Sequence, residues 1–180
     1  MSKNIFFIGP ASVGKTTAGN LLAHKIGAQF IDINKEFCEQ IALIPDYIKA
    51  NGYAGYCEAN SILVDSLITK YPTNTVFATP SGFLVHEDSP HLVIKHLKLI
   101  KKGISILLLP SREALQGIDV IVQRQQHRWS DVVAEKEKER FLARFEKYKK
   151  YGDIKIFSLQ SLDQIVDEIY DKGITELFNK

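Results

Sequence analysis

The segment that most constrains this chain is a glycine-rich loop that follows a short apolar run near the N-terminus. Ile5–Ile8 is entirely apolar, and the residues after it, Gly9-Pro-Ala-Ser-Val-Gly14-Lys15-Thr16, match the pattern Gly-x4-Gly-Lys-[Ser/Thr] in full. From Lys15 to Ile26 the apolar residues have helical spacing, and Gly27 follows. A strand, this loop and a helix in that order predict a phosphate-binding P-loop at the N-terminus of a helix.

Each residue type in the loop suits the binding of a nucleoside triphosphate. Glycine lets the backbone turn its amide groups toward phosphate, and Lys15 is expected to reach the β- and γ-phosphates. The Thr16 hydroxyl is expected to coordinate Mg²⁺, so ATP and Mg²⁺ are the predicted cofactors. The nucleotide-binding residues that we predict are Gly9, Ala11, Ser12, Val13, Gly14, Lys15, Thr16 and Thr17.

The bulk properties narrow the class of protein further. With 180 residues, 45% of them hydrophobic, and a net charge of +2, the chain fits one domain over residues 1–180 and gives no reason to expect nucleic acid as a partner. No apolar stretch approaches the roughly 20 residues of a membrane span. Cys38 and Cys57 are widely spaced, which is typical of free thiols in a reducing compartment, so we expect a cytoplasmic location without a signal peptide.

Apolar runs alternate with helical segments along the rest of the chain, which predicts a parallel sheet. The expected strands are 5–8, 29–32, 75–78, 104–109 and 155–158, and the expected later helices are 91–101, 131–151 and 161–170. Residues 35–70 are predicted to be helical but broken at Pro45, Asn51-Gly52 and Gly55. The result is an α/β, three-layer P-loop kinase fold with a five-stranded parallel sheet, whose ligands bind at the carboxyl ends of the strands.

A P-loop is shared by kinases, GTPases and motor ATPases, and other features favour a kinase. The chain has no Asn-Lys-x-Asp guanine motif, and it is too short for most large ATPase machines. P-loop proteins of this size are most often nucleotide or metabolite kinases, which is an argument from analogy. We therefore expect a small hydroxylated molecule as the partner.

Five further segments fit one family. They are Asp32-Ile33-Asn34, Gly52–Glu58, Ala78–Gly82, Ser111–Leu115 with Arg124, and Arg144 with Tyr148. Together with the P-loop they make the chain resemble the shikimate kinases over nearly its whole length. The resemblance implies ATP-dependent transfer of a phosphoryl group to shikimate, an acceptor-covering helical segment at about 33–70 and a lid at about 117–130.

The resemblance also implies roles for single residues. Asp32 would help to hold Mg²⁺ through water, so Thr16 and Asp32 are the predicted metal residues. Arg124 would meet the transferring phosphate, and Lys15, Asp32 and Arg124 form the predicted catalytic set. The predicted substrate residues are Asn34, Cys57, Gly82 and Arg144.

Three of those substrate positions depart from the family. Asn34 replaces an aspartate that binds a substrate hydroxyl, Cys57 replaces an arginine that binds the substrate carboxylate, and Gly82 is all that remains of a triple glycine. Each charged hydrogen bond contributes roughly 1.5–3 kcal/mol. Two such losses weaken shikimate binding by a factor on the order of 10³. Lys49 and Arg128 are candidates to compensate.

Smaller departures affect the lid and the segment that covers the acceptor. Tyr53 replaces a glutamate of the family, Gln125 replaces the proline after the lid arginine, and Gly117 replaces an earlier lid arginine.

Other polar residues are expected to have simpler roles. Glu36 could act as a base, but its position favours an acid in the first turn of a helix. The loop residues His86, Glu87 and Asp88 are predicted to be solvated. His127 and Arg128, beside Trp129 and close to Arg124, are predicted to contact phosphate and not nucleic acid.

Three functions remain open from the sequence. The first is a kinase for shikimate, and the second is a kinase of the same fold for a different hydroxylated metabolite. The third is a nucleotide-binding module without phosphotransfer, because an intact P-loop stands beside an altered acceptor site.

Overall fold

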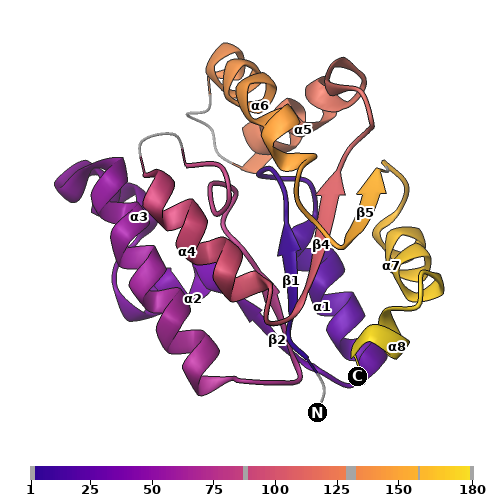
Figure 1. Cartoon of the computed structure of the whole chain (residues 1–180). Helices are drawn as coiled ribbons and strands as arrows, with labels where there is room; N and C mark the ends of the chain where they lie inside the picture. The colour runs from indigo at the N-terminus through magenta and orange to yellow at the C-terminus, as the bar shows by residue number, and fades with distance from the viewer. Residues whose placement is uncertain (1–2, 87–88, 129–132, 158, 179–180) are drawn as a thin grey trace.

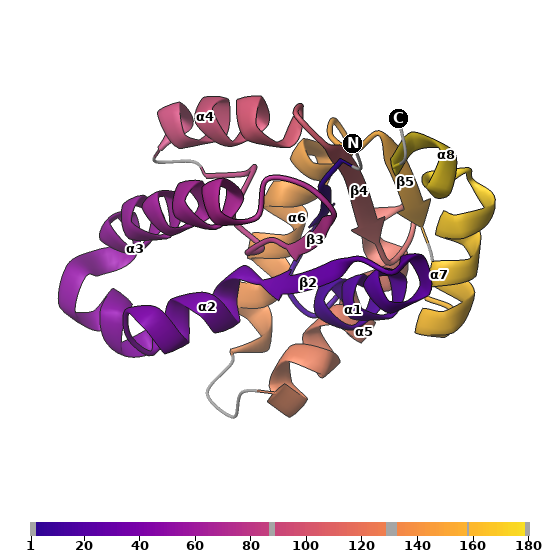
Figure 2. The same cartoon turned by 90° about the horizontal axis from the view of Figure 1, so that it is seen from below.

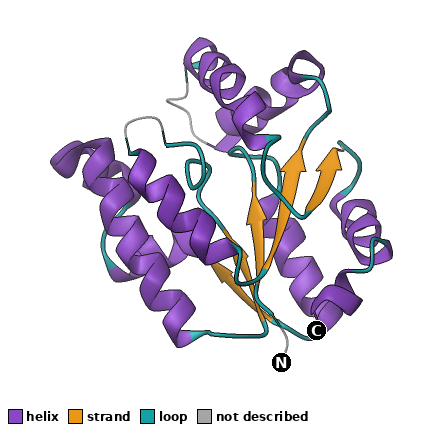
Figure 3. Cartoon of the chain, in the orientation of Figure 1, coloured by secondary structure: helices purple, strands orange, loops and turns teal. Residues whose placement is uncertain are grey.

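The computed structural model describes residues 3–86, 89–128, 133–157 and 159–178. A five-stranded sheet runs through it in the order β2-β3-β1-β4-β5, and every neighbouring pair is parallel (Figure 3). The strands are β1 (Ile5–Ile8), β2 (Gln29–Asp32), β3 (Thr75–Ala78), β4 (Ile104–Leu109) and β5 (Ile154–Phe157). The predicted fold class is confirmed.

Helices cover both faces of this sheet and its carboxyl edge. Figure 2 shows α1 and α4 on opposite sides of the strands, and Figure 1 shows α5 and α6 above the carboxyl ends of β1 and β4. The helices are α1 (Lys15–Ile26), α2 (Ile33–Gln40), α3 (Ile44–Lys70), α4 (Pro90–Ile100), α5 (Ala114–Arg128), α6 (Ala134–Tyr148), α7 (Leu162–Asp171) and α8 (Ile174–Phe178). No helix of the described ranges is long and apolar enough to cross a membrane.

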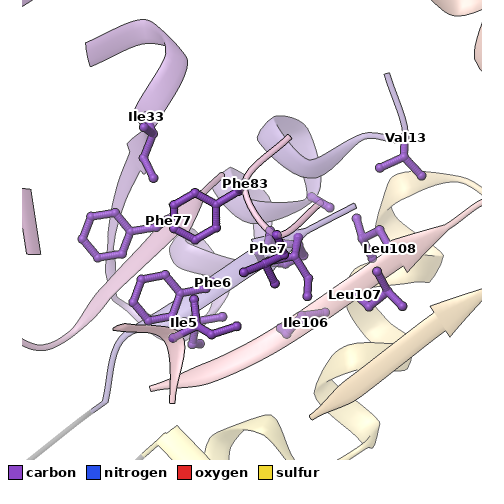
Figure 4. Packing of buried hydrophobic residues seen from close by; sticks show 14 of the residues in the cluster. Ile5, Phe6, Phe7, Val13, Ile33, Phe77, Phe83, Ile106, Leu107 and Leu108 are labelled. Carbon is purple, nitrogen blue, oxygen red and sulfur yellow. The ribbon is translucent and has the colours of Figure 1, made fainter. Parts of the chain in front are cut away.

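The three inner strands of the sheet form the centre of the hydrophobic core. Every residue of β1, β3 and β4 is buried, as expected for strands covered on both faces. Phe6 and Phe77 stack across the β1–β3 pair with ring centroids 5.3 Å apart, and Ile106 on β4 continues this core (Figure 4). Packing in this apolar core therefore sets the position of the sheet edge at which β1 and β3 end.

The predicted element boundaries need a few corrections. β5 begins at Ile154, one residue before the predicted start, and the predicted end at Ser158 lies outside the described residues. The predicted break near Pro45 is confirmed, because α2 ends at Gln40 and α3 begins at Ile44, with Pro45 in its first turn where the missing N–H costs nothing. Gly55 is helical, so the predicted break there is wrong.

At Gly52 the predicted break is real. The backbone there has φ 74° and ψ 167°, which kinks α3 in a conformation that glycine tolerates.

In the C-terminal half of the chain, three helices differ from the predicted elements. The predicted helix 131–151 is shorter, because α6 runs from Ala134 to Tyr148. Most of the predicted lid segment is helical, because α5 continues to Arg128. The short helix α8 was missed, whereas the predicted cap of α7 is confirmed by a capping box between Ser161 and Gln164.

Candidate active site

A cavity of about 1110 Å³ opens at the carboxyl ends of the strands. The P-loop and Leu162 form one end of its wall, and α3 with the loop after β3 forms the other. Residues of α5 and α6, which lie above the sheet in Figure 1, complete the lining. The cavity therefore joins the predicted phosphate site to the predicted acceptor site.

The P-loop is held in shape by close backbone packing against β4. Gly9 has φ 140°, and a Cβ there would lie 2.3 Å from the carbonyl oxygen of Leu108, so only glycine fits. Gly14 has φ 104° and precedes α1 as its N-cap. Lys15 is 8% exposed, and its Nζ donates to the carbonyl oxygens of Gly9 at 2.9 Å and Pro10 at 2.6 Å. The loop thus holds an ammonium group at the cavity wall.

A hydroxyl and a carboxylate meet beside the loop. Thr16 Oγ1 donates to Asp32 Oδ2 at 2.6 Å, and Asp32 Oδ1 accepts from the backbone N–H groups of Asn34 at 2.9 Å and Lys35 at 3.2 Å. Asp32 is therefore fixed as the N-cap of α2. Adjacent hydroxyl and carboxylate oxygens are the donors that Mg²⁺ prefers, so the donor set fits that ion.

The structure brings the four predicted substrate residues to one cavity. Asn34, Cys57, Gly82 and Arg144 all line it. Tyr56 donates its hydroxyl hydrogen to Asn34 Oδ1 at 3.3 Å, which orients that amide. These residues come from the first turn of α2, from α3, from the loop after β3 and from α6, four separate segments of the sequence.

Phenol groups surround the positive charge of Arg144. The Arg144 guanidinium lies close enough to the phenols of Tyr53 and Tyr148 to act on the pKa of both, and Tyr148 donates its hydroxyl hydrogen to the carbonyl oxygen of Ser81. Burial raises the pKa of both tyrosines, and the guanidinium opposes that rise, so both phenols are neutral at neutral pH. A Cβ on Gly82 would lie 2.6 Å from the Tyr53 hydroxyl, so Tyr53 narrows this end of the cavity.

His86 corrects one prediction, because it lies at the cavity wall and is not a solvated loop residue. Its Nδ1 is 3.4 Å from Cys57 Sγ. Burial lowers the pKa of His86 to about 4, with smaller contributions from His96 and Arg144. The imidazole is therefore neutral at neutral pH, so the described contact of the Cys57 thiol is with an uncharged group. Glu87 and Asp88 lie outside the described residues.

The remaining predicted residues divide between the cavity and the surface. Arg124 lines the cavity, as expected for a lid arginine. Lys49, Glu36 and His127 are not among its lining residues, so Lys49 does not replace the lost arginine in this conformation. Glu36 accepts a hydrogen bond from Gln40 on α2 at 2.6 Å, which agrees with its predicted role in the helix. Trp129 and the Arg128 side chain are not described.

Asn60 and Arg140 are among the polar lining residues that were missed from the sequence. Asn60 follows Cys57 by three residues on α3, and Arg140 precedes Arg144 by four residues on α6, where it pairs with Glu137 at 2.5 Å. Each of them lies one helical turn from a predicted site residue, so helical spacing could have identified both from the sequence.

The His86 environment predicts a pH dependence of stability. Because the folded-state pKa is lowered from 6.5 to about 4, the unfolded chain binds more protons in that window, and the free energy of unfolding is expected to fall as pH drops from 6.5 toward 4. His86→Gln should flatten this slope in urea titrations across the window. His96, whose pKa is also lowered, remains in both proteins, so part of the slope should persist in His86→Gln. An identical slope in the two proteins would refute the assignment.

Comparison with known proteins gives a consistent result. The family model described as shikimate kinase matches residues 11–173. A shikimate kinase of Nitrosomonas europaea is 35% identical over 94 residues, 52% of this chain and 44% of the relative. One from Psychrobacter sp. is 36% identical over 106 residues, 58% of this chain and 54% of the relative. The chain thus spans about half the length of the curated relatives it matches.

Solved structures share the fold at low sequence identity. A shikimate kinase from Acinetobacter baumannii, in complex with shikimate, superposes with a TM-score of 0.79 at 22% identity, covering 98% of this chain and 95% of that one. A gluconokinase from Sinorhizobium meliloti gives 0.56 at 18% identity, covering 99% and 94%. At these identities the likeness concerns the fold.

Proposed function

This chain belongs to the shikimate kinase family, and on that basis we propose that it transfers the γ-phosphoryl group of ATP to a hydroxyl of a small metabolite. Shikimate is the best single candidate. The observation that carries the proposal is one cavity that is lined both by the P-loop and by Asn34, Cys57, Gly82 and Arg144. Such a cavity holds donor and acceptor in one enclosure, which is the main requirement of phosphoryl transfer.

The residues at the phosphate end have distinct proposed roles. Lys15 binds the β- and γ-phosphates, and Arg124 offsets negative charge on the transferring group. Thr16 and Asp32 would hold Mg²⁺, which when bound supplies further charge neutralisation between the phosphates. Two backbone hydrogen bonds already hold the Asp32 carboxylate in position, so that side chain needs little reorganisation to bind the ion.

Asn34 is proposed to orient the acceptor hydroxyl, with its own amide fixed by Tyr56. An amide does not take up a proton in this range of pH, so Asn34 does not act as the base. Phosphoryl transfer proceeds through a loose transition state in which the attacking hydroxyl needs orientation more than early deprotonation. The reaction is therefore compatible with asparagine at this position.

A kinase for a different hydroxylated metabolite is the second candidate. It is favoured by the contact of the Cys57 thiol with the neutral His86, because the family resemblance implies an arginine for the shikimate carboxylate at position 57. A nucleotide-binding module without phosphotransfer is the third, since Asn34 stands where that resemblance implies an aspartate. We further propose a cytoplasmic location, in keeping with the free thiols of Cys38 and Cys57.

ADP release measured against a panel of hydroxylated metabolites separates these candidates. ADP formation with shikimate supports the first candidate, and ADP formation with another acceptor supports the second. Nucleotide binding with no acceptor-dependent ADP formation across the panel would exclude both kinase proposals and leave the third.

The proposed lid at about 117–130 makes a testable prediction. Lids of kinases close over bound phosphates and exclude water. Amides of α5 should exchange quickly with deuterium in the free protein and become protected when a non-hydrolysable ATP analogue and Mg²⁺ are added. The buried strand β4 serves as the control, because its amides should be protected in both states. Equal protection of α5 with and without the analogue would count against a lid there.

A further inference from the structure

A buried glutamine on α5 reaches the cavity without a hydrogen-bond partner. Gln125 is 7% exposed and is one of the residues that line the cavity. Within the described part of the chain its side-chain amide hydrogen bonds with no other residue, yet neither polar atom of that amide is sealed from solvent. Buried polar groups in native proteins are nearly always paired. The accessible amide is therefore available to a molecule bound in the cavity.

The place of Gln125 on its helix distinguishes it from a surface glutamine. Ile118, Ile121, Val122 and Gln125 stand at positions i, i+3, i+4 and i+7 of α5, and all four are buried. The first three are apolar, so the fourth position buries an amide without an internal hydrogen bond to offset the cost. The family resemblance implies a proline at this position, and proline has no side-chain donor. The amide is therefore not part of that resemblance.

The topology places this amide at the phosphate end of the cavity. Among the described side chains of α5, those of Arg124 and Gln125 line the cavity. Figure 1 shows α5 above the carboxyl ends of β1 and β4, and the P-loop begins where β1 ends. Asn34 and Gly82 follow β2 and β3, which lie on the other side of β1 in the sheet. This arrangement favours a contact of Gln125 with the nucleotide over a contact with the acceptor.

The lining around Gln125 favours an anionic ligand. Among the described residues, the charged lining side chains that α5 and α6 contribute are Arg124, Glu137, Arg140 and Arg144. Three of these four carry positive charge, and Lys15 adds an ammonium group from the P-loop. Phosphate oxygens are strong hydrogen-bond acceptors, so a neutral amide meets them through the hydrogens on its nitrogen.

We propose that Gln125 is a nucleotide-binding residue whose Nε2 donates a hydrogen bond to a phosphate oxygen of bound ATP. The inference rests on the proposed binding of ATP at the P-loop and adds a phosphate ligand from α5. Arg124 supplies charge, and Gln125 supplies a directed hydrogen bond, which is stronger to an ionised oxygen than to a neutral one. Because both residues belong to α5, phosphate binding fastens this helix over the P-loop.

Gln125→Leu tests the proposal, with a non-hydrolysable ATP analogue and Mg²⁺ as the probe and calorimetry as the measurement. Leucine has a similar size and continues the apolar stripe, so the free protein should melt at an equal or higher temperature. Affinity for the analogue should fall about tenfold or more, the effect of one lost hydrogen bond to a charged group. Affinity for shikimate, measured without nucleotide, should not change.

Two further variants keep the test decisive. Gln125→Glu keeps the size of the side chain and removes the donor. Its affinity for the analogue should fall at least as far as that of Gln125→Leu, because a carboxylate and a phosphate repel each other. Gln126→Leu makes the matched change at the next residue of α5, which is exposed and does not line the cavity, and should bind the analogue like the wild type.

Equal affinity for the analogue in the wild type and both Gln125 variants, including no measurable binding by any of them, would overturn the inference. Wild-type affinity in Gln125→Glu alone would also overturn it, because a carboxylate has no hydrogen to donate to phosphate. So would a loss of shikimate affinity with analogue affinity intact, which would place the amide against the acceptor.

Product formation by the wild type is assayed separately, so that the two proposals can fail independently. Weaker binding of the analogue by the variants, together with no phosphoryl transfer by the wild type, refutes only the proposed function. Transfer by the wild type, together with unchanged binding of the analogue by the variants, refutes only the inference.

Discussion

Lys15→Ala is expected to reduce ATP binding or turnover by at least about 2 kcal/mol, a factor of about thirty. In the free protein the Lys15 ammonium is held by the carbonyl oxygens of Gly9 and Pro10, so it stands at the phosphate end of the cavity before any ligand binds. Alanine removes the positive charge that is proposed to bind the β- and γ-phosphates. The other lysine of α1, Lys25, lies in the last turn of that helix and outside the P-loop. The loss should appear in kcat/KM for ATP.

A matched control separates this effect from the general loss of a surface charge. Lys98→Ala changes an exposed lysine of α4 that is not among the lining residues, so ATP turnover should stay at the wild-type level. If Lys15→Ala binds and turns over ATP like its parent, the assignment of the P-loop is wrong.

The second large effect is expected from rebuilding the acceptor wall. Asn34→Asp combined with Cys57→Arg should raise shikimate affinity by more than either change alone, because the two residues contact opposite ends of one ligand. The combined gain can reach the order of 10³ if both charged hydrogen bonds form. Both positions line the cavity that Arg144 also lines, so the new arginine would supply a second guanidinium for the carboxylate.

Wild-type protein should accordingly phosphorylate shikimate poorly. Shikimate affinity of the two single variants, the double variant and the parent gives the comparison, with ATP affinity as the internal control. Efficient phosphorylation of shikimate by the unmodified protein would mean that other residues have taken over these roles. That outcome would refute the interpretation that the changes at positions 34 and 57 weaken shikimate binding, but it would support kinase activity.

Local sequence signals were sufficient for most of the fold. The runs Ile5–Ile8 and Ile104–Leu109 are apolar throughout because both faces of an inner parallel strand are covered, and their ends were predicted correctly. Gly27 marks the end of α1 for a local reason, since it takes φ 67° there. The break at Gly55 was wrong because a single glycine inside a helix costs only about 1 kcal/mol, which tertiary packing readily offsets.

The candidate site was predictable where its chemistry is contiguous in sequence. The predicted phosphate ligands all lie within the P-loop, and Asp32 lies at the end of β2, so both predictions follow from the chain read in order. The contact of His86 with Cys57 joins residues 29 positions apart, and no local pattern distinguishes such a histidine from a solvated one. The Tyr148 hydroxyl reaches the carbonyl oxygen of Ser81 across 67 positions, so it was equally invisible to local reasoning.

Detection of a phosphorylated acceptor by mass spectrometry is the decisive test of phosphoryl transfer by this protein. Wild-type protein, ATP and Mg²⁺ are incubated with a mixture of hydroxylated metabolites that includes shikimate, and Lys15→Ala runs in parallel. We expect the wild type to form a phosphorylated product together with ADP, and the variant to form at least about thirtyfold less. ATP binding by the wild type without any phosphorylated acceptor would exclude the proposed phosphoryl transfer, and equal product from both proteins would exclude the proposed role of Lys15.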